Sequence, residues 1–445
     1  MRLSRLLTGC LIAALCFHAS VVVGQIPIIP DSSANFNSDF HFQLTTVSQA
    51  HPTFRSPYSG ANSLASDEPT AMSLTATIFW GIQVGKLGEF YVNPEIAGGS
   101  GLSSAHGIAG FPNGEAFRVG DPSPAFYFAR VYLQHTFNFG GEETYVGESA
   151  NQVNKTQSTK YLDVVLGKFS MADFYDNNKY SHDPRSQFLN WGLMSGGAWD
   201  YPANVRGYTW GVHLEYGQPT WAVRGAVVMV PKEANGNELD MDLATHHSYT
   251  LAFEKSYTVG KRPGVARILG FYTLANMGNY DRAVALQPTA PDITTTRAPG
   301  TTKYGWVFNI EQELNNRMGA FARASWNDGT NETWAFTEID RSYSLGIVDK
   351  VGIFKKNSDE FGLAALANGI SSPHRNYLAA GGYGFILGDG KLNYGWEWVT
   401  EAYYKVNMFY SGFWLTADYQ FVVNPGYNLD RGPVSVFTLR AHIEL

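Results

Sequence analysis

Apolar and polar side chains alternate one by one over long stretches of this chain, and this alternation restricts the fold more than any other feature. From Met72 to Val84, every second residue is apolar, and most residues between them are small or polar. The same pattern returns from Phe437 to Leu445. Because successive side chains of a β-strand point to opposite faces of the sheet, each stretch predicts a strand with one apolar and one polar face.

Sixteen segments of the sequence carry this pattern. Most have about ten residues or more, which is the length that a tilted strand needs to cross a bilayer. The segments near residues 265 and 340 alternate less regularly than the others. The expected strands are 38–50, 70–84, 88–100, 125–139, 160–170, 207–216, 220–231, 248–258, 265–275, 303–316, 318–327, 340–349, 359–368, 396–407, 411–423 and 434–445.

The connections between these segments alternate in length. The long connections, which are rich in Gly, Pro, Asn and Asp, include 101–124, 171–206, 276–302 and 369–395. The short connections include 85–87, 217–219 and 408–410. The stretch 140–159 is the exception, since it is long where a short turn is expected. Short turns at one end and long loops at the other are typical of transmembrane barrels, whereas a soluble β-sandwich has no reason to keep its long loops together.

The sequence ends on the last of these strands, at Leu445. An unpaired edge strand invites aggregation, so we expect the last strand to pair with the first and close the sheet. A closed barrel of sixteen strands encloses an aqueous lumen, whereas eight strands leave room only for side chains. The sequence therefore predicts an all-β fold, a transmembrane antiparallel β-barrel of about 16 strands with long external loops and short periplasmic turns.

The first 24 residues have the layout of a secretory signal peptide. Arg2 and Arg5 give a basic start, an apolar stretch follows from Leu6 to Val23, and Gly24 is a small residue at the expected cleavage site. We therefore expect export of a mature domain, residues 25–445, to the outer membrane of a Gram-negative-type bacterium.

Two other interpretations of this segment stay open. The run Leu7–Cys10 resembles a lipoprotein box, although the apolar stretch continues past Cys10. A retained membrane anchor is the other, although its apolar run would be interrupted. If the signal peptide is removed, Cys10 and Cys16 go with it and the mature chain has no thiol, which excludes disulfides and cysteine metal sites.

Charge and motifs exclude several further classes of function. The formal net charge of −7 argues against nucleic acid as a partner. The adjacent His246 and His247 would point to opposite faces of a strand, and the zinc-protease and serine-hydrolase motifs are missing. We expect no metal and no cofactor. Ser181, His182 and Asp183 are neighbours in a long loop, so a barrel enzyme acting at the membrane surface remains an alternative. Asp340 and Arg341 are expected to form a structural ion pair.

Alternation also predicts which side chains line the interior. In a membrane the apolar face points to lipid, so the polar face lines the pore. Both signs of charge, amides, hydroxyls and rings would meet there, which suits a neutral polyhydroxylated solute, although the same side chains would also simply keep the lumen hydrated. The expected lining is Glu89, Tyr91, Asn93, Glu95, Arg130, Tyr132, Gln134, Asn138, Glu397, Glu401, Tyr403, Lys405, Trp414, Thr416, Asp418, Gln420, Arg440, His442 and Glu444.

Several long strings in this order resemble the carbohydrate-selective porins of the OprB type, over nearly the whole mature chain. The strings are FRSPYSGANSL at 54–64, FYVNPE at 90–95, GFPNGEA at 110–116, DPRSQFLNWGLMSGGAWDYPANVRGYTWG at 183–211, TEIDR at 337–341, YLAAGGYGFILGDGKLNYG from 377, EAYY at 401–404 and DYQFVVNPGYNLDRGPVSVF from 418. The final Leu445 departs from the Phe with which outer-membrane barrels usually end.

The resemblance implies a sixteen-stranded barrel in which inward-folded loops narrow a channel for glucose and related sugars. By this likeness, the candidates for the constriction are Glu95, Glu115, Arg118, Arg130 and Arg185. The candidate sugar-contacting aromatics are Trp191, Trp199 and Tyr201. The alternative for these rings is that they hold the loop against the inner wall of the barrel.

We thus expect a porin that allows passive diffusion of sugars through a water-filled channel, without catalysis. A general porin with no sugar preference is the main alternative. The expected partners are small carbohydrates, outer-membrane lipid and the barrel-assembly machinery, with a homotrimer as a possible assembly.

Overall fold

The computed structural model describes residues 37–84, 88–116, 123–350, 359–408 and 412–445. The expected signal peptide, residues 1–24, lies outside the described residues. No helix in the described part of the chain is long and apolar enough to span a membrane.

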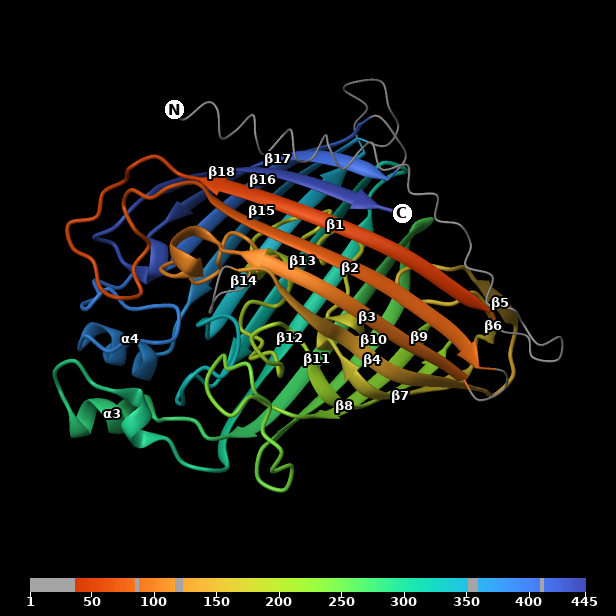
Figure 1. Cartoon of the computed structure of the whole chain (residues 1–445), viewed down its shortest axis with the longest axis horizontal. Helices are drawn as coiled ribbons and strands as arrows, with labels where there is room; N and C mark the ends of the chain where they lie inside the picture. Colours follow the sequence, from red (N-terminus) through yellow and green to blue (C-terminus); the bar gives the residue numbers. More distant parts are fainter. Residues whose placement is uncertain (1–36, 85–87, 117–122, 351–358, 409–411) are drawn as a thin grey trace. The chain divides into compact units, whose positions relative to one another are not determined.

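Sixteen antiparallel strands form one closed barrel (Figure 1). All sixteen expected strands are present, and their ends lie within three residues of the expected positions. The closing contact is the expected one, since the first and last strands pair with Val47 opposite Arg440. The barrel strands are β1 Ser38–Ala50, β2 Ala71–Val84, β3 Gly88–Gly99, β4 Ala125–Asn138, β7 Tyr161–Phe169, β8 Thr209–Gln218, β9 Trp221–Val228, β10 His247–Val259, β11 Arg262–Ala275, β12 Thr301–Glu313, β13 Met318–Asn327, β14 Arg341–Asp349, β15 Glu360–Gly369, β16 Glu397–Asn407, β17 Phe413–Val423 and β18 Val434–Glu444.

The stretch 140–159 contains a small separate sheet. Its strands, β5 Glu143–Val146 and β6 Lys155–Ser158, pair with each other and not with the barrel. Figure 1 shows them at the end of the barrel opposite the helices α3 Tyr280–Leu286 and α4 Ser372–Ala379. We call the end with the helices the loop end and the other the turn end. At the turn end, β8 extends further than expected, so the β8–β9 turn lies at 219–220 and not at 217–219.

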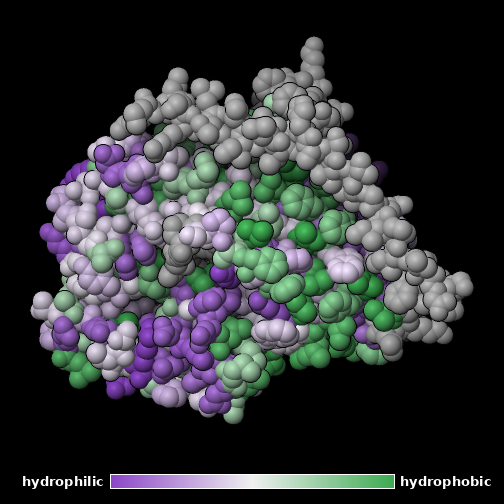
Figure 2. All heavy atoms as spheres, in the orientation of Figure 1, coloured by the Kyte–Doolittle hydropathy of each residue, from purple (hydrophilic) through white to green (hydrophobic). Residues whose placement is uncertain are grey.

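The two faces of the barrel differ as the alternation predicts. On the outer face, Leu251 and Leu345 are each 64% exposed. On the inner face, the polar Glu401 and Gln420 are both 0% exposed. Hydrophobic side chains gather over the strands, and hydrophilic side chains gather toward the loop end (Figure 2). An apolar exterior with a polar interior is the arrangement of a barrel surrounded by lipid.

Two long connections fold into the lumen, as the resemblance implied. They are the segments 101–116 and 171–206, which contain the short helices η2 Leu102–Ala105, η3 Met171–Asp173 and α2 Trp191–Met194. Charged residues of the wall bind their backbones. The Arg440 guanidinium donates to the carbonyl oxygens of Pro184 and Gln187, each at 2.7 Å. Since buried backbone groups need partners, these wall residues make the inward course of the loops possible.

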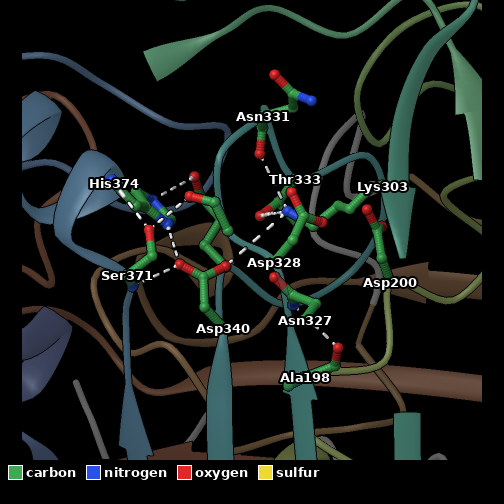
Figure 3. Close-up of polar contacts among 12 residues, drawn as sticks. Ala198, Asp200, Lys303, Asn327, Asp328, Asn331, Thr333, Asp340, Ser371 and His374 are labelled. Atoms are coloured by element: carbon green, nitrogen blue, oxygen red, sulfur yellow. Dashed lines mark hydrogen bonds and ion pairs between the residues drawn. The ribbon is translucent and has the colours of Figure 1, made fainter. Parts of the chain in front are cut away.

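At the loop end, a buried polar cluster joins three connections (Figure 3). The His374 imidazole on α4 contacts the Asp340 carboxylate at 3.1 Å, and the Lys303 ammonium lies 3.9 Å from the same carboxylate. Ser371 donates its backbone amide to Asp340 at 2.8 Å. The prediction of an ion pair between Asp340 and Arg341 was wrong. Arg341 begins β14, and its guanidinium donates to the carbonyl oxygen of Ile370 at 3.1 Å. Strand β12 and the connection between β15 and β16 are thereby tied to one carboxylate, that of Asp340.

Candidate permeation site

A cavity of about 80 Å³ lies inside the barrel, where the two inward loops meet the wall formed by β2 and β3. Such a volume holds several water molecules. The residues around it come from five separate segments of the chain. They are Thr75, Glu95, Phe111, Gly114, Glu115, Ala116, Arg185, Trp191, Val205, Arg206, Gly207, Tyr208 and Phe336.

The Arg185 guanidinium lies between two carboxylates of this cavity. Its Nη2 is 3.2 Å from Oε2 of Glu95, and its Nε is 3.1 Å from Oε2 of Glu115. The remaining donor, Nη1, binds Oε1 of Gln43 at 2.9 Å and Oγ1 of Thr77 at 3.1 Å. One arginine from the loop therefore makes contacts with three barrel strands, β1, β2 and β3, which fixes its position beside the cavity.

Burial and the neighbouring charges of opposite sign have opposite effects on the pKa values of the two loop residues, Arg185 and Glu115. Burial disfavours the charged form of Arg185, but the carboxylates of Glu115 and Glu95 outweigh it and raise the pKa of the guanidinium. Burial raises the pKa of the Glu115 carboxyl, and the Arg185 charge offsets only part of that effect. The cation is thus held firmly, whereas Glu115 gives up its proton less readily than an exposed glutamate.

The Glu95 carboxylate lies beside the cavity and binds four side chains. Besides Arg185, its carboxylate accepts hydrogen bonds from the hydroxyls of Thr77, Tyr127 and Tyr208. Only 3% of Glu95 is exposed, so these donors replace the water that the charge would otherwise need.

Arg130 is near the cavity but belongs to a different pair. Its Nε and Nη2 donate to the Asp173 carboxylate at 2.7 and 2.6 Å, in a two-point contact. Its guanidinium carbon lies 5.4 Å from the centre of the Tyr208 ring. Arg130 therefore supports the wall through Tyr208 and is not among the residues around the cavity. Arg118, the remaining constriction candidate, lies outside the described residues.

The three candidate aromatics lie at different depths. Trp191 borders the cavity, and its ring is stacked on Phe336 with the centroids 4.6 Å apart and on Phe111 with the centroids 5.2 Å apart. Trp199 and Tyr201 lie behind it and are 1% and 2% exposed. The Tyr201 hydroxyl accepts the backbone amide of Ala172 at 2.9 Å. Among the three, the ring that a solute in the cavity can reach is that of Trp191.

Nine of the thirteen residues around the cavity were not site candidates from the sequence, and Arg206, Tyr208, Thr75 and Phe336 are among them. Arg206 has its guanidinium carbon 4.1 Å from the centre of the Tyr127 ring, and Tyr208 donates to Glu95 at 3.2 Å. Both lie within the string NVRGYTW at 204–210, directly before β8. Thr75 is on the polar face of β2, so the alternation already placed it in the lumen. Phe336 carries no sequence signal for this position.

The neighbouring Ser181, His182 and Asp183 do not form a catalytic arrangement. The Ser181 hydroxyl donates to the carbonyl oxygen of Leu193 at 2.7 Å, and the Asp183 carboxylate accepts from Ser186 at 2.6 Å. His182 contributes its backbone amide to Gln187 at 2.7 Å. Within the ranges that the structure covers, no group of three or more His, Cys, Asp or Glu residues is placed to hold a metal.

Comparisons with known proteins bear on the fold and the family. A search of curated proteins returns no match. Among solved structures, the chain is similar to OprB of Pseudomonas putida at high pH, with a TM-score of 0.68 and 15% identity over 92% of this chain and 94% of that one. It is also similar to the outer membrane channel DcaP of Acinetobacter baumannii, with a TM-score of 0.50 and 9% identity over 92% and 97% of the two chains.

The structural similarities, at these identities, concern the fold alone. The family assignment rests on a sequence model, that of the carbohydrate-selective porins of the OprB family, which matches residues 75–445. This match covers most of β2 and every later strand of the barrel, and both inward loops lie within it. The chain belongs to the OprB family of carbohydrate-selective porins.

Proposed function

We propose that this porin allows glucose-like sugars to diffuse passively across the outer membrane through the passage beside Arg185. The observation that carries the proposal is the cavity itself, in which a paired arginine, two carboxylates and the Trp191 ring border one small space. Sugar hydroxyls both donate and accept hydrogen bonds, and the apolar face of a sugar ring packs on an aromatic ring.

Balanced charge around the cavity supports a neutral solute. Arg185 pairs with both Glu95 and Glu115, and Arg206 also borders the cavity, so two cations meet two anions. A passage for ions of one sign would carry an excess of the opposite charge. The OprB-family membership agrees with a carbohydrate as the solute.

Liposome swelling tests the proposal. Vesicles containing the protein are diluted into isosmotic solutions of glucose, of an uncharged oligosaccharide too large for the cavity, and of the glucose-sized gluconate anion. We expect fast swelling in glucose and slow swelling in the other two. Equal rates for glucose and gluconate would support a general porin without sugar preference, which is the main alternative.

A surface enzyme is the second alternative. It predicts vesicles that stay impermeable to glucose together with a hydrolytic activity that Asp183→Ala abolishes. Because Asp183 is occupied by Ser186 and by the backbone of Arg185, we expect no such activity.

The same proposal includes how the protein is exported, inserted into the outer membrane and assembled. Export would use residues 1–24 as a signal peptide, and insertion would use the barrel-assembly machinery. Outer-membrane lipid would surround the exposed apolar face. A homotrimer is the assembly we propose to test, by cross-linking in the membrane followed by mass determination.

A further inference from the structure

We infer that the lumen holds a second sugar-binding site, on the turn-end side of the cavity and formed by Glu215, Arg224, Glu254, Arg267 and Glu311. We call these five residues the turn-end row. The inference rests on the proposed function, because it assigns to a sugar the site that the solute meets before or after the passage beside Arg185.

The row takes one side chain from each of five consecutive strands, β8 to β12. Glu215 lies opposite Arg224 in the register, and Glu254 lies opposite Arg267. All five belong to the turn-end halves of their strands, whereas Glu95 belongs to the loop-end half of β3. The row and the cavity are therefore at different heights in the barrel.

The charges of the row alternate in sign and are paired from end to end. Arg224 contacts Glu215 through Nε and Oε2 of Glu254 through Nη1 at 3.1 Å. Arg267 contacts the same Oε2 through Nε at 2.7 Å and Oε2 of Glu311 through Nη1 at 3.2 Å. Each guanidinium is thus held in a fixed orientation by two carboxylates.

Pairing leaves one polar atom unused in each of four residues of the row, all except Glu215, whose second oxygen accepts from Tyr161. Within the described part of the chain, no hydrogen bond reaches Nη2 of Arg224, Oε1 of Glu254, Nη2 of Arg267 or Oε1 of Glu311. None of the four is among the buried atoms without a partner, so each keeps contact with open lumen. The side chains of these residues are 9% to 21% exposed.

The four unused atoms form a series of donor, acceptor, donor and acceptor along the wall. Adjacent hydroxyls of a sugar offer the complementary series, since each hydroxyl accepts from one neighbour and donates to another. The ion pairs hold the atoms in place before the solute arrives, which reduces the ordering cost of binding. A polyhydroxylated, uncharged solute is the ligand class that this series fits.

The competing explanation is that the row only ties five strands together. The double variant Arg224→Lys with Arg267→Lys separates the two. Lysine keeps the positive charge between the carboxylates, but its single ammonium group cannot present a second, rigidly oriented donor to the lumen. A purely structural row would tolerate this change without an effect on sugar.

The experiment measures block of single-channel current by glucose in a planar bilayer, with glucose added to each compartment in turn. We expect the double variant to raise the half-blocking concentration roughly fivefold for addition from one side, because two hydrogen bonds are lost. Block from the other side, conductance without sugar and reversal potential in a KCl gradient should stay at their wild-type values. Each single variant should give part of the rise.

Arg317→Lys is the matched control, since Arg317 is at the turn end, pairs with Asp349 and is not in the row. Half-blocking concentrations in the double variant that equal the wild-type values on both sides would overturn the turn-end row while leaving the proposed function intact. A wild-type channel that glucose does not block from either side would also overturn the turn-end row, and slow liposome swelling in glucose would overturn the proposed function together with it.

Discussion

The carboxylate of Glu401, on the barrel wall, accepts a 2.9 Å hydrogen bond from the backbone amide of Asn190 in the inward loop. Its other oxygen accepts the amide of Leu189 at 2.6 Å. Asn190 in turn caps α2, the helix that carries Trp191. A single wall carboxylate therefore sets the position of the ring that borders the cavity, and the loop is a fixed part of the cavity wall.

Removing this anchor should loosen the loop. Glu401→Ala leaves two buried amides without acceptors, which costs about 3 kcal/mol if each amide loses a typical hydrogen bond. We expect a lower melting temperature and noisier open-channel current than in the wild type. Glu238→Ala, at an exposed position, is the control. Current noise equal to that of the wild type would show that the loop does not depend on Glu401.

Replacing each tryptophan by alanine tests which of the two rings borders the cavity and which only packs in the core. Trp191→Ala should weaken block by glucose roughly fivefold, because one ring contact is worth about 1 kcal/mol. Trp199→Ala should instead destabilise the fold by about 3 kcal/mol through loss of core packing. Planar-bilayer block and thermal unfolding separate these effects. Trp210→Ala, on the lipid-facing side of β8, is the control for loss of an indole. Unchanged block in Trp191→Ala would place the sugar contact elsewhere.

The preference of the channel for cations or anions should change when Arg185, one of the two cations of the cavity, is replaced. Arg185→Gln leaves Glu95 and Glu115 without their common partner, so we expect a shift toward cations. One elementary charge at 4 Å is worth about 1 kcal/mol in water, or roughly a fivefold change in preference. The reversal potential in a KCl gradient measures it, with Arg317→Gln as the control. A shift toward anions would contradict the charge assignment.

Stability at the loop end should depend on pH through Asp340. Burial opposes ionisation of this carboxyl, but His374 and Lys303 outweigh burial and lower the pKa of Asp340 from 3.8 to about 2. A lowered pKa contributes stability above the unfolded value, and that contribution is lost as the pH falls from about 4 toward 2. It amounts to about 2 kcal/mol for a shift of this size.

Asp340→Asn should therefore melt at a lower temperature than the wild type at pH 7. The difference should shrink as the pH falls from 4 to 2, where the wild-type carboxyl also becomes neutral. Thermal unfolding followed by circular dichroism measures both. A difference that stays constant over this range would mean that the charge of Asp340 contributes nothing.

The strands could be predicted because their signal is local. A period of two residues and the length of each connection are both readable along the chain, and the expected pairing of the first and last strands was confirmed by the contact between β1 and β18. The sheet of β5 and β6 was not predicted, although its stretch had been recognised as an exception. Its four-residue strands are too short for the alternation to show.

The details of the cavity could not be read in the same way. Alternation places Arg130 in the lumen, but its partner Asp173 comes from a loop 43 residues further along. The string at 183–211 contains the three candidate rings, Trp191, Trp199 and Tyr201, but it does not show which of them a solute reaches. Phe336 stacks on Trp191 from a loop far away in the sequence. These contacts depend on how the loops fold inward, and neither period nor spacing encodes that course.

Uptake of labelled glucose by proteoliposomes tests the central claim most directly. The account predicts that glucose equilibrates across the vesicle wall without an energy source and without chemical change, faster than in protein-free vesicles. It also predicts that uptake slows in Trp191→Ala and keeps its wild-type rate in Trp210→Ala. Glucose uptake no faster than in protein-free vesicles, from a barrel that circular dichroism shows to be folded, would contradict it.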